Sequence, residues 1–263
     1  MLDFENKPSY GVDDLIRLIG LLRGPGGCPW DAEQTHESIR RNLLEEAYET
    51  AEAIENGDND NLIEELGDVL MQVVFHADIA AKDGGFTLGD ITDATCRKLI
   101  RRHPHVFGGA RAKDGAESLG FWDDIKRGEK LQDTASEAMR SVASTLPALG
   151  RAEKIQKKAA KAGFDWPEYT GAVETLRAEI DELGAAIIEE GDVEEELGDI
   201  LFSAVNVARY IGVDPEKALG RSCDKFIGRF TKLEEKAGVL GLRLEDMTFE
   251  EMDALYMQGK LEK

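Results

Sequence analysis

The sequence predicts an all-α protein made of two related halves. Helical periodicity runs through most of the 263 residues, no alternating strand pair with an Asn-Gly turn is found, and one acidic pattern occurs twice. The hydrophobic content of 42% is typical of a globular chain, and no apolar run reaches bilayer-spanning length. We expect an N-terminal domain over residues 1–110, a connector over 111–145 and a C-terminal domain over 146–263.

Turn-forming residues mark where the predicted helices end. Glycine, aspartate, asparagine and proline favour turns over continued helix. Clusters of them interrupt the helical pattern at residues 56–60, 82–86, 103–109, 162–168, 189–192 and 211–215. The polar stretch near 109–140 is interpreted as the connector between the two halves.

The composition narrows the classes of partner and compartment. A net charge of −21 repels nucleic-acid polymers and anionic membranes, although small anions can bind through metal ions or local cations. The N-terminal stretch lacks the basic region of a signal peptide. Cys28, Cys96 and Cys223 are far apart and form no CxxC pair, which argues against a zinc site. We therefore expect a cytoplasmic protein without nucleic-acid or membrane partners.

An acidic pattern is written twice in the chain. EELGDVLMQVVFHA begins at Glu64 and EELGDILFSAVNVA begins at Glu195, and a second pair of acids precedes each of them. Acids beside an apolar run are costly unless something pairs with them. The spacing of the acids and of later basic residues is the same in both halves except where loops intervene, which indicates a tandem duplication.

The acids of each half are expected to meet across a helical hairpin. Residues three apart share one face of a helix, and facing residues of an antiparallel hairpin have position numbers with a constant sum. This rule pairs Glu46 with Asp68, Glu49 with Glu65, Glu179 with Asp199, and Glu182 with Glu196. The alternative is a solvated acidic face with a few salt bridges between neighbouring turns.

Four facing carboxylates predict a divalent metal site in each half. The carboxylates cannot all remain ionised at close range without cations. Oxygen ligands without cysteine or histidine select hard cations, so we expect Mg²⁺, with Mn²⁺ or Ca²⁺ as alternatives. No metal-ligand spacing relates His36, His76, His103 and His105 to one another.

Two basic pairs follow the acidic hairpins. Lys98 with Arg102, and Lys225 with Arg229, lie four residues apart on later helices. Beside a metal cluster these side chains are candidates for binding phosphate oxygens. An ordinary exposed helix face is the alternative interpretation for either pair.

Several motifs together resemble those of the bacterial MazG family of nucleoside triphosphate pyrophosphohydrolases. They are CPWDAEQTHESIRRNLLEEAYETAEAI (28–54), EELGDVLMQVVF (64–75), KLIRRHPHVFG (98–108), RAEKIQKKAAKAGFDW (151–166) and EEELGDILFSAVNVAR (194–209). The resemblance implies two tandem helical-bundle domains and a homodimer. It also implies Mg²⁺-dependent cleavage of nucleoside triphosphates between the α- and β-phosphates, which yields a nucleoside monophosphate and pyrophosphate.

The resemblance also implies roles for single residues. The family motif EExxE…ExxD falls on Glu45, Glu46, Glu49, Glu65 and Asp68 in the first half, and on Glu179, Glu182, Glu196 and Asp199 in the second. The phosphate-contacting Lys and Arg of the family fall on Lys225 and Arg229, and its nucleotide-contacting aromatic residue falls on Tyr256. Glu45, Glu46 and Glu179 are the candidates for catalysis, and Glu45 can orient or deprotonate the attacking water.

Each half departs from the family pattern at one position. Ala178 stands where the second motif should begin with glutamate. Seven residues after the last acid, the first half has Phe75 and the second has Asn206, which can make a polar contact to a nucleotide. Tyr256 also follows the second half. We therefore expect the second half to be the catalytic one.

Two other functions fit the same residues. The first is a related pyrophosphohydrolase with another substrate, such as dUTP or phosphoribosyl-ATP. The second is a dimeric regulatory or scaffold protein whose acids bind metal without turnover. Intact acidic quartets in both halves weigh against a scaffold, because a scaffold has no need of them.

Overall fold

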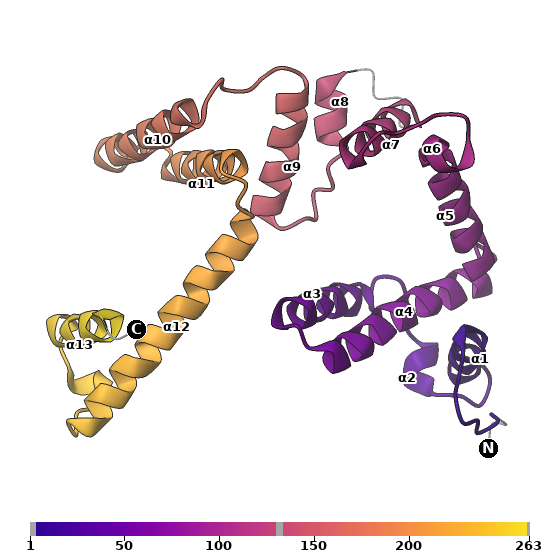
Figure 1. Cartoon of the computed structure of the whole chain (residues 1–263). Helices are drawn as coiled ribbons and strands as arrows, with labels where there is room; N and C mark the ends of the chain where they lie inside the picture. Colours follow the sequence, from indigo (N-terminus) through magenta and orange to yellow (C-terminus); the bar gives the residue numbers. More distant parts are fainter. Residues whose placement is uncertain (1–3, 130–133, 262–263) are drawn as a thin grey trace. The chain divides into compact units, whose positions relative to one another are not determined.

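The computed structural model describes residues 4–129 and 134–261, and every regular element in these ranges is a helix (Figure 1). The predicted all-α class is therefore confirmed. The chain divides into two compact units, Met1–Lys126 (unit 1) and Arg127–Lys263 (unit 2), and the division falls inside the segment assigned to the connector. Among the described residues, no helix has both the length and the hydrophobicity needed to cross a bilayer.

Unit 1 is built around one helical hairpin. Helices α3 and α4 pack against each other, and α1 also packs on α4. The core lies where α1 meets α4 and includes Ile19, Val74 and Phe75. The helices of this unit are α1 (Val12–Leu22), α2 (Pro29–Ala32), α3 (Arg40–Asn56), α4 (Asn59–Lys82), α5 (Leu88–Arg102), α6 (Pro104–Phe107) and α7 (Gly115–Glu129), which crosses the division.

Unit 2 repeats the hairpin and adds a long helix after it. Helices α10 and α11 form the hairpin, α9 packs on α11, and α13 packs on α12 (Figure 1). Gln156 is the buried residue of α9, whereas Ile19 is that of α1. The helices are α8 (Ala135–Arg140), α9 (Ala148–Lys161), α10 (Tyr169–Glu189), α11 (Val193–Tyr210), α12 (Pro215–Val239) and α13 (Phe249–Leu261), with a 3₁₀ turn η1 (Leu244–Asp246) before the last.

Short turns with defined chemistry close both hairpins. Gly57 ends α3 in the left-handed region at φ 67°, where glycine carries no steric penalty, and Asp58 caps α4 by accepting two backbone N–H groups. In unit 2 the left-handed position is Glu190, at φ 57°, and Asp192 caps α11. The helix ends fall where the turn residues of the sequence predict them, at Asn56, Lys82, Arg102, Lys161, Glu189 and Tyr210.

Candidate metal and nucleotide site

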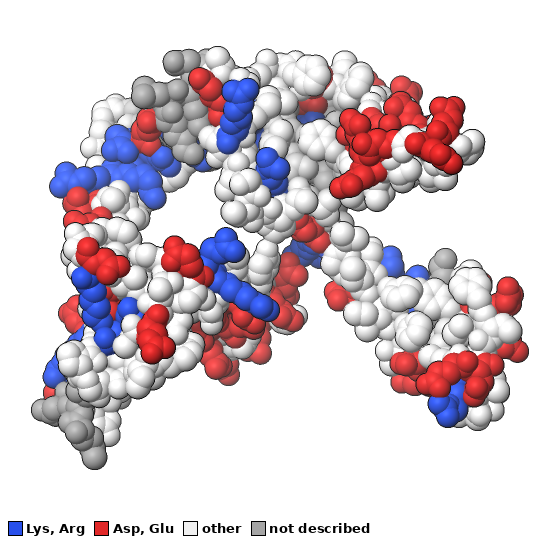
Figure 2. Space-filling model, turned by 180° about the vertical axis from the view of Figure 1, so that it is seen from behind, with Lys and Arg blue, Asp and Glu red and all other residues white. Residues whose placement is uncertain are grey.

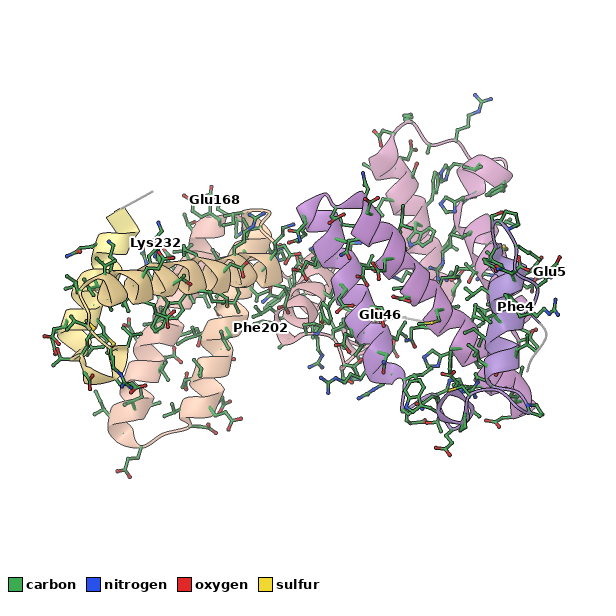
Figure 3. All side chains as sticks on the ribbon, turned by 90° about the horizontal axis from the view of Figure 1, so that it is seen from below. Phe4, Glu5, Glu46, Glu168, Phe202 and Lys232 are labelled. Carbon is green, nitrogen blue, oxygen red and sulfur yellow. The ribbon has the colours of Figure 1, made fainter. Side chains whose placement is uncertain are left out.

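The hairpin of unit 1 brings its acids together. Glu46 and Glu49 on α3 and Glu65 on α4 each offer a carboxylate oxygen, and these oxygens lie within 4.8 Å of one another. Among neighbouring charges, that of Asp68 acts most strongly on Glu46, and that of Glu49 acts most strongly on Glu65. These are the pairs that the antiparallel register predicts. Glu45, the preceding residue, is exposed. Figure 3 labels Glu46 on α3.

The hairpin of unit 2 also brings acids together, but its trio is not the repeat equivalent of that in unit 1, and Glu182 acts more strongly on Glu179 than Asp199 does. Glu179 on α10 and Glu196 and Asp199 on α11 offer oxygens within 4.8 Å of one another. The charge of Glu182 acts on both Glu179 and Glu196, so all four acids lie within electrostatic reach. Figure 2 shows acidic side chains gathered over this hairpin. Ala178 leaves no second acid before Glu179.

The carboxylates of each cluster repel one another. Partial removal from water, and then repulsion by neighbouring carboxylates, raises the pKa of Glu46, Glu65, Glu179 and Glu196 above the ordinary value. No basic side chain is among the groups that shift the pKa of Glu179. A divalent cation would relieve this repulsion, and a donor set made only of carboxylate oxygens suits Mg²⁺ or Mn²⁺.

The basic candidates lie on other helices than the acids. Across residues 4–129 and 134–261, no ion pair joins Lys98, Lys225 or Arg229 to the acidic clusters. The guanidinium of Arg102 lies over the ring of Trp122, with 5.0 Å to the centroid. Tyr256 on α13 packs on α12, where its ring centroid is 5.9 Å from that of Phe226, the neighbour of Lys225. The structure therefore places Tyr256 next to the helix of the second basic pair.

Unit 2 contains a charged network that the sequence patterns do not predict. The Asp165 carboxylate receives Arg209 Nη1 at 2.9 Å and Nη2 at 2.5 Å. The same guanidinium donates from Nε and Nη2 to Asn206 Oδ1, at 3.2 and 2.8 Å. The ion pair with Arg209 holds the pKa of Asp165 below its usual range. Asn206 therefore sits at the end of a fixed chain of polar contacts.

Unit 1 has the same construction with its charges reversed. Asp78 occupies the repeat position of Arg209, and its Oδ2 receives Arg23 Nε at 2.7 Å. The Arg23 guanidinium lies over the Phe75 ring, with 4.8 Å to the centroid. Phe75 is buried at the repeat position of Asn206. Each half has a charged residue ten positions after its last metal-site acid, but this spacing does not identify the partner in either ion pair.

Two histidines also meet in unit 1, although their sequence spacing gives no hint of it. His36 Nδ1 and His76 Nδ1 are 2.8 Å apart, and the rings are stacked. A hydrogen bond between two ring nitrogens needs one donor and one acceptor, so the pair holds only while one imidazole is neutral. Burial lowers the pKa of His76, and the nearby His36 lowers it further.

The histidine pair is expected to make stability fall in mild acid. The pKa of His76 is lowered in the folded chain, so the unfolded chain binds more protons once the pH drops below the ordinary value of 6.5. The stabilisation is therefore present above that pH and lost below it. Urea unfolding of the wild type and of His76→Asn at pH 7.5 and 5.5 measures the effect. The variant should lose less stability between the two pH values, and equal losses would contradict the prediction.

The chain matches known proteins along most of its length. A model of the MazG nucleotide pyrophosphohydrolase domain matches residues 34–107 and 168–233. A nucleoside triphosphate pyrophosphohydrolase/pyrophosphatase MazG of Thermotoga maritima is 43% identical over 252 residues, which cover 94% of this chain and 95% of the relative. The nucleoside triphosphate pyrophosphohydrolase of Escherichia coli strain K12 is 41% identical over 254 residues, or 95% and 97%. An uncharacterized protein of Bacillus subtilis, YabN, is 46% identical over 260 residues, or 97% of this chain and 53% of its own length.

The matched segments coincide with the acidic hairpins. The first segment contains α3 and α4, and the second contains α10 and α11, so both clusters lie in regions that the family model recognises. The tandem arrangement expected from the repeated acids is confirmed. The chain belongs to the MazG nucleotide pyrophosphohydrolase family.

Proposed function

We infer that the chain hydrolyses nucleoside triphosphates to a nucleoside monophosphate and pyrophosphate, with Mg²⁺ bound by the acidic clusters. The observation that carries this proposal is the pair of carboxylate clusters, each with oxygens within 4.8 Å, on hairpins that the family model matches. The names of the relatives in Thermotoga maritima and Escherichia coli support the substrate class.

The residues present fit a divalent cation. In unit 2 the ion would be held by Glu179, Glu196 and Asp199, with Glu182 close enough to contribute charge. Carboxylate oxygens alone supply the donors, and the ion would offset the repulsion that raises the pKa of Glu179 and Glu196. When bound, such an ion polarises phosphate oxygens and lowers the pKa of a bound water.

Other side chains of unit 2 would handle the nucleotide. Two cations lie on α12: Lys225 is exposed and Arg229 is half-buried. They can neutralise charge on the departing pyrophosphate. Asn206 offers a polar contact two turns beyond the acids on α11, and Tyr256 offers an aromatic face. In unit 1, Glu45 is exposed beside Glu46 and can orient or deprotonate water, a position that Ala178 leaves empty of charge in unit 2.

The protein is proposed to act as a homodimer. Leu66 and Leu70 on α4, and Leu197 and Leu201 on α11, are exposed at matching repeat positions. Exposed apolar residues repeated on two hairpins favour burial against a second copy, and a closed two-fold dimer is the commonest way to achieve this. A dimer would also allow the basic helix of one copy to approach the acids of the other.

Product analysis tests the proposal directly. We expect nucleoside monophosphate and pyrophosphate from a panel of nucleoside triphosphates, with Mg²⁺ or Mn²⁺ required and EDTA abolishing release, because the acids cannot hold substrate phosphates without cations. Sedimentation of the same sample should give the mass of two chains. Release of a nucleoside diphosphate and phosphate would show that another bond is cleaved.

The same panel separates the competing functions. Activity confined to dUTP or phosphoribosyl-ATP would identify a related pyrophosphohydrolase. Metal binding by calorimetry, without pyrophosphate release from any nucleotide, would identify a regulatory or scaffold protein instead.

A further inference from the structure

We propose that Asp165 and Arg209 orient the amide of Asn206 so that its NH₂ group reads a carbonyl of the nucleobase, which makes unit 2 selective for keto bases. The inference rests on the proposed function, because it assigns substrate selectivity to the same site. Asn206 would touch the substrate, whereas Asp165 and Arg209 act through it as positioning residues.

The orientation of the amide follows from hydrogen-bond chemistry. A guanidinium has only donors, and Arg209 directs both Nε and Nη2 at one atom of Asn206, at 3.2 and 2.8 Å. That atom must be the amide oxygen, because an NH₂ group could not accept either bond. The other end of the amide is therefore Nδ2, and it has no partner among the residues that the structure describes.

The Arg209 guanidinium that orients the amide is held in turn by Asp165. Arg209 makes a two-pronged contact with the Asp165 carboxylate, and its side chain is only 12% exposed. The Tyr210 hydroxyl donates to Asp165 Oδ1 at 2.6 Å and also contacts the carbonyl of Trp166. A guanidinium held at both prongs has little freedom to turn, so the amide it binds is preorganised.

The position of Asn206 suits a group that reads the base. It follows Asp199 by seven residues on α11, which places it about 10 Å further along the helix on nearly the same face. The acids of the cluster are proposed to hold the phosphates, so the nucleoside would extend along the helix from them. Asn206 is half-buried, and so accessible in part to a ligand.

In unit 1, Phe75 occupies the repeat position of Asn206. There the ring of Phe75 is 7% exposed and lies under the guanidinium of Arg23. A phenyl ring neither donates nor accepts the bonds of an amide, and its burial in the core leaves no edge for a base. Both units keep an ion pair with a largely buried arginine, but only in unit 2 does that arginine contact a polar group at this position.

A lone donor discriminates between carbonyl and amino groups. The NH₂ of Asn206 can donate to O6 of a 6-oxopurine or O4 of uracil, whereas the amino groups of adenine and cytosine at these positions would face it with donors of their own. An unsatisfied donor costs enough to change binding by about tenfold or more. We therefore expect a higher kcat/KM for ITP than for ATP, and for UTP than for CTP.

Substitution of the reading group tests the proposal. Asn206→Asp keeps an oxygen toward Arg209 and replaces the NH₂ donor with an acceptor. The keto-to-amino ratio of kcat/KM should fall by about tenfold and approach or pass unity. Dissociation constants of the α,β-methylene analogues of UTP and CTP should shift in the same direction without turnover. A wild-type ratio retained by Asn206→Asp would overturn the proposal.

Substitution of the anchor tests the positioning. Asp165→Ala should lower the keto-to-amino ratio although Asn206 remains, and Asp165→Glu should restore part of it. The control is Glu153→Ala, which removes an acid from the nearby α9 where it pairs with Lys157, and it should leave the ratio unchanged. Equal loss of activity on all four nucleotides with Asp165→Ala, at an unchanged ratio, would show a purely structural role and overturn the positioning.

Different results would overturn the base selectivity and the proposed function. Pyrophosphate release at equal rates within each nucleotide pair would overturn this inference and leave the proposed function intact. Absence of release from every nucleotide would overturn the proposed function itself. Should Asp165→Ala not fold, the Asn206→Asp result decides, because that half-buried position tolerates a side chain of nearly the same shape.

Discussion

Glu196→Gln is expected to abolish pyrophosphate release, whereas Glu65→Gln should leave most of it. Glutamine keeps the shape of the side chain but removes the negative charge needed to hold a divalent cation. Loss of that ion from a catalytic site should lower kcat by a factor on the order of a hundred or more. The two variants change equivalent positions of the duplicated hairpins, so each is the matched control for the other.

The preference for unit 2 depends on what surrounds two similar clusters. In each cluster, oxygens of three acids lie within 4.8 Å of one another, so metal binding alone does not distinguish the units. Only unit 2 has a polar side chain two turns beyond the cluster, since Phe75 fills that position in unit 1 and is buried. Tyr256 packs on α12 in unit 2, the helix that carries Lys225 and Arg229.

The assay needs a measure of folding beside it. Glu65 and Glu196 both have a raised pKa because of desolvation and neighbouring carboxylates, so their ionised forms destabilise the metal-free fold as the pH rises above the ordinary value of 4.5. Glutamine at either position should raise the thermal midpoint without metal at neutral pH and reduce the stabilisation by Mg²⁺. A folded Glu65→Gln that is inactive, beside an active Glu196→Gln, would assign catalysis to unit 1.

The hairpins and their acids could be predicted from the sequence because their geometry is local. A helix fixes which residues share a face, and a short turn fixes which positions oppose each other, so the pairing of Glu49 with Glu65 required no tertiary information. The helix ends were predictable for the same reason, since capping and turn residues act within a few positions.

The contacts between distant segments could not be predicted in this way. Asp165 and Arg209 are 44 residues apart, and Arg23 and Asp78 are 55 apart, so no helical or turn spacing relates them. Charge type gave no guide either, because the acid and the base exchange places between the units. The basic pairs are predicted to bind phosphate oxygens, and this stays a prediction, since no ion pair joins Lys98, Lys225 or Arg229 to the acids in the described chain. Local sequence patterns do not determine the direction in which the next helix packs.

Asp78→Ala is expected to destabilise unit 1 by about 3–5 kcal/mol, the cost of leaving one partner of a buried ion pair unpaired. The Arg23 side chain is only 4% exposed, and its Nε lies 2.7 Å from Asp78 Oδ2. Lys82 contacts the same carboxylate oxygen at 2.7 Å, but it is 42% exposed and water can solvate it in the variant. The stranded charge would therefore be that of Arg23, in contact with the buried ring of Phe75.

Urea unfolding with a matched control measures this cost. Asp93→Ala also removes an acid from an ion pair of unit 1, but Arg97 and Asp93 are 73% and 58% exposed, so its effect should be about 0.5 kcal/mol or less. Asp78→Asn should fall between the two, because the amide keeps an acceptor for Arg23 and loses the charge. A loss with Asp78→Ala no larger than with Asp93→Ala would mean that Arg23 is satisfied by its other contacts, the backbone carbonyls of Asp31 and Gln34. The ion pair would then position α1 on α4 without adding to stability. By analogy, the role of the reversed pair in unit 2 would be to orient Asn206 and not to stabilise the fold.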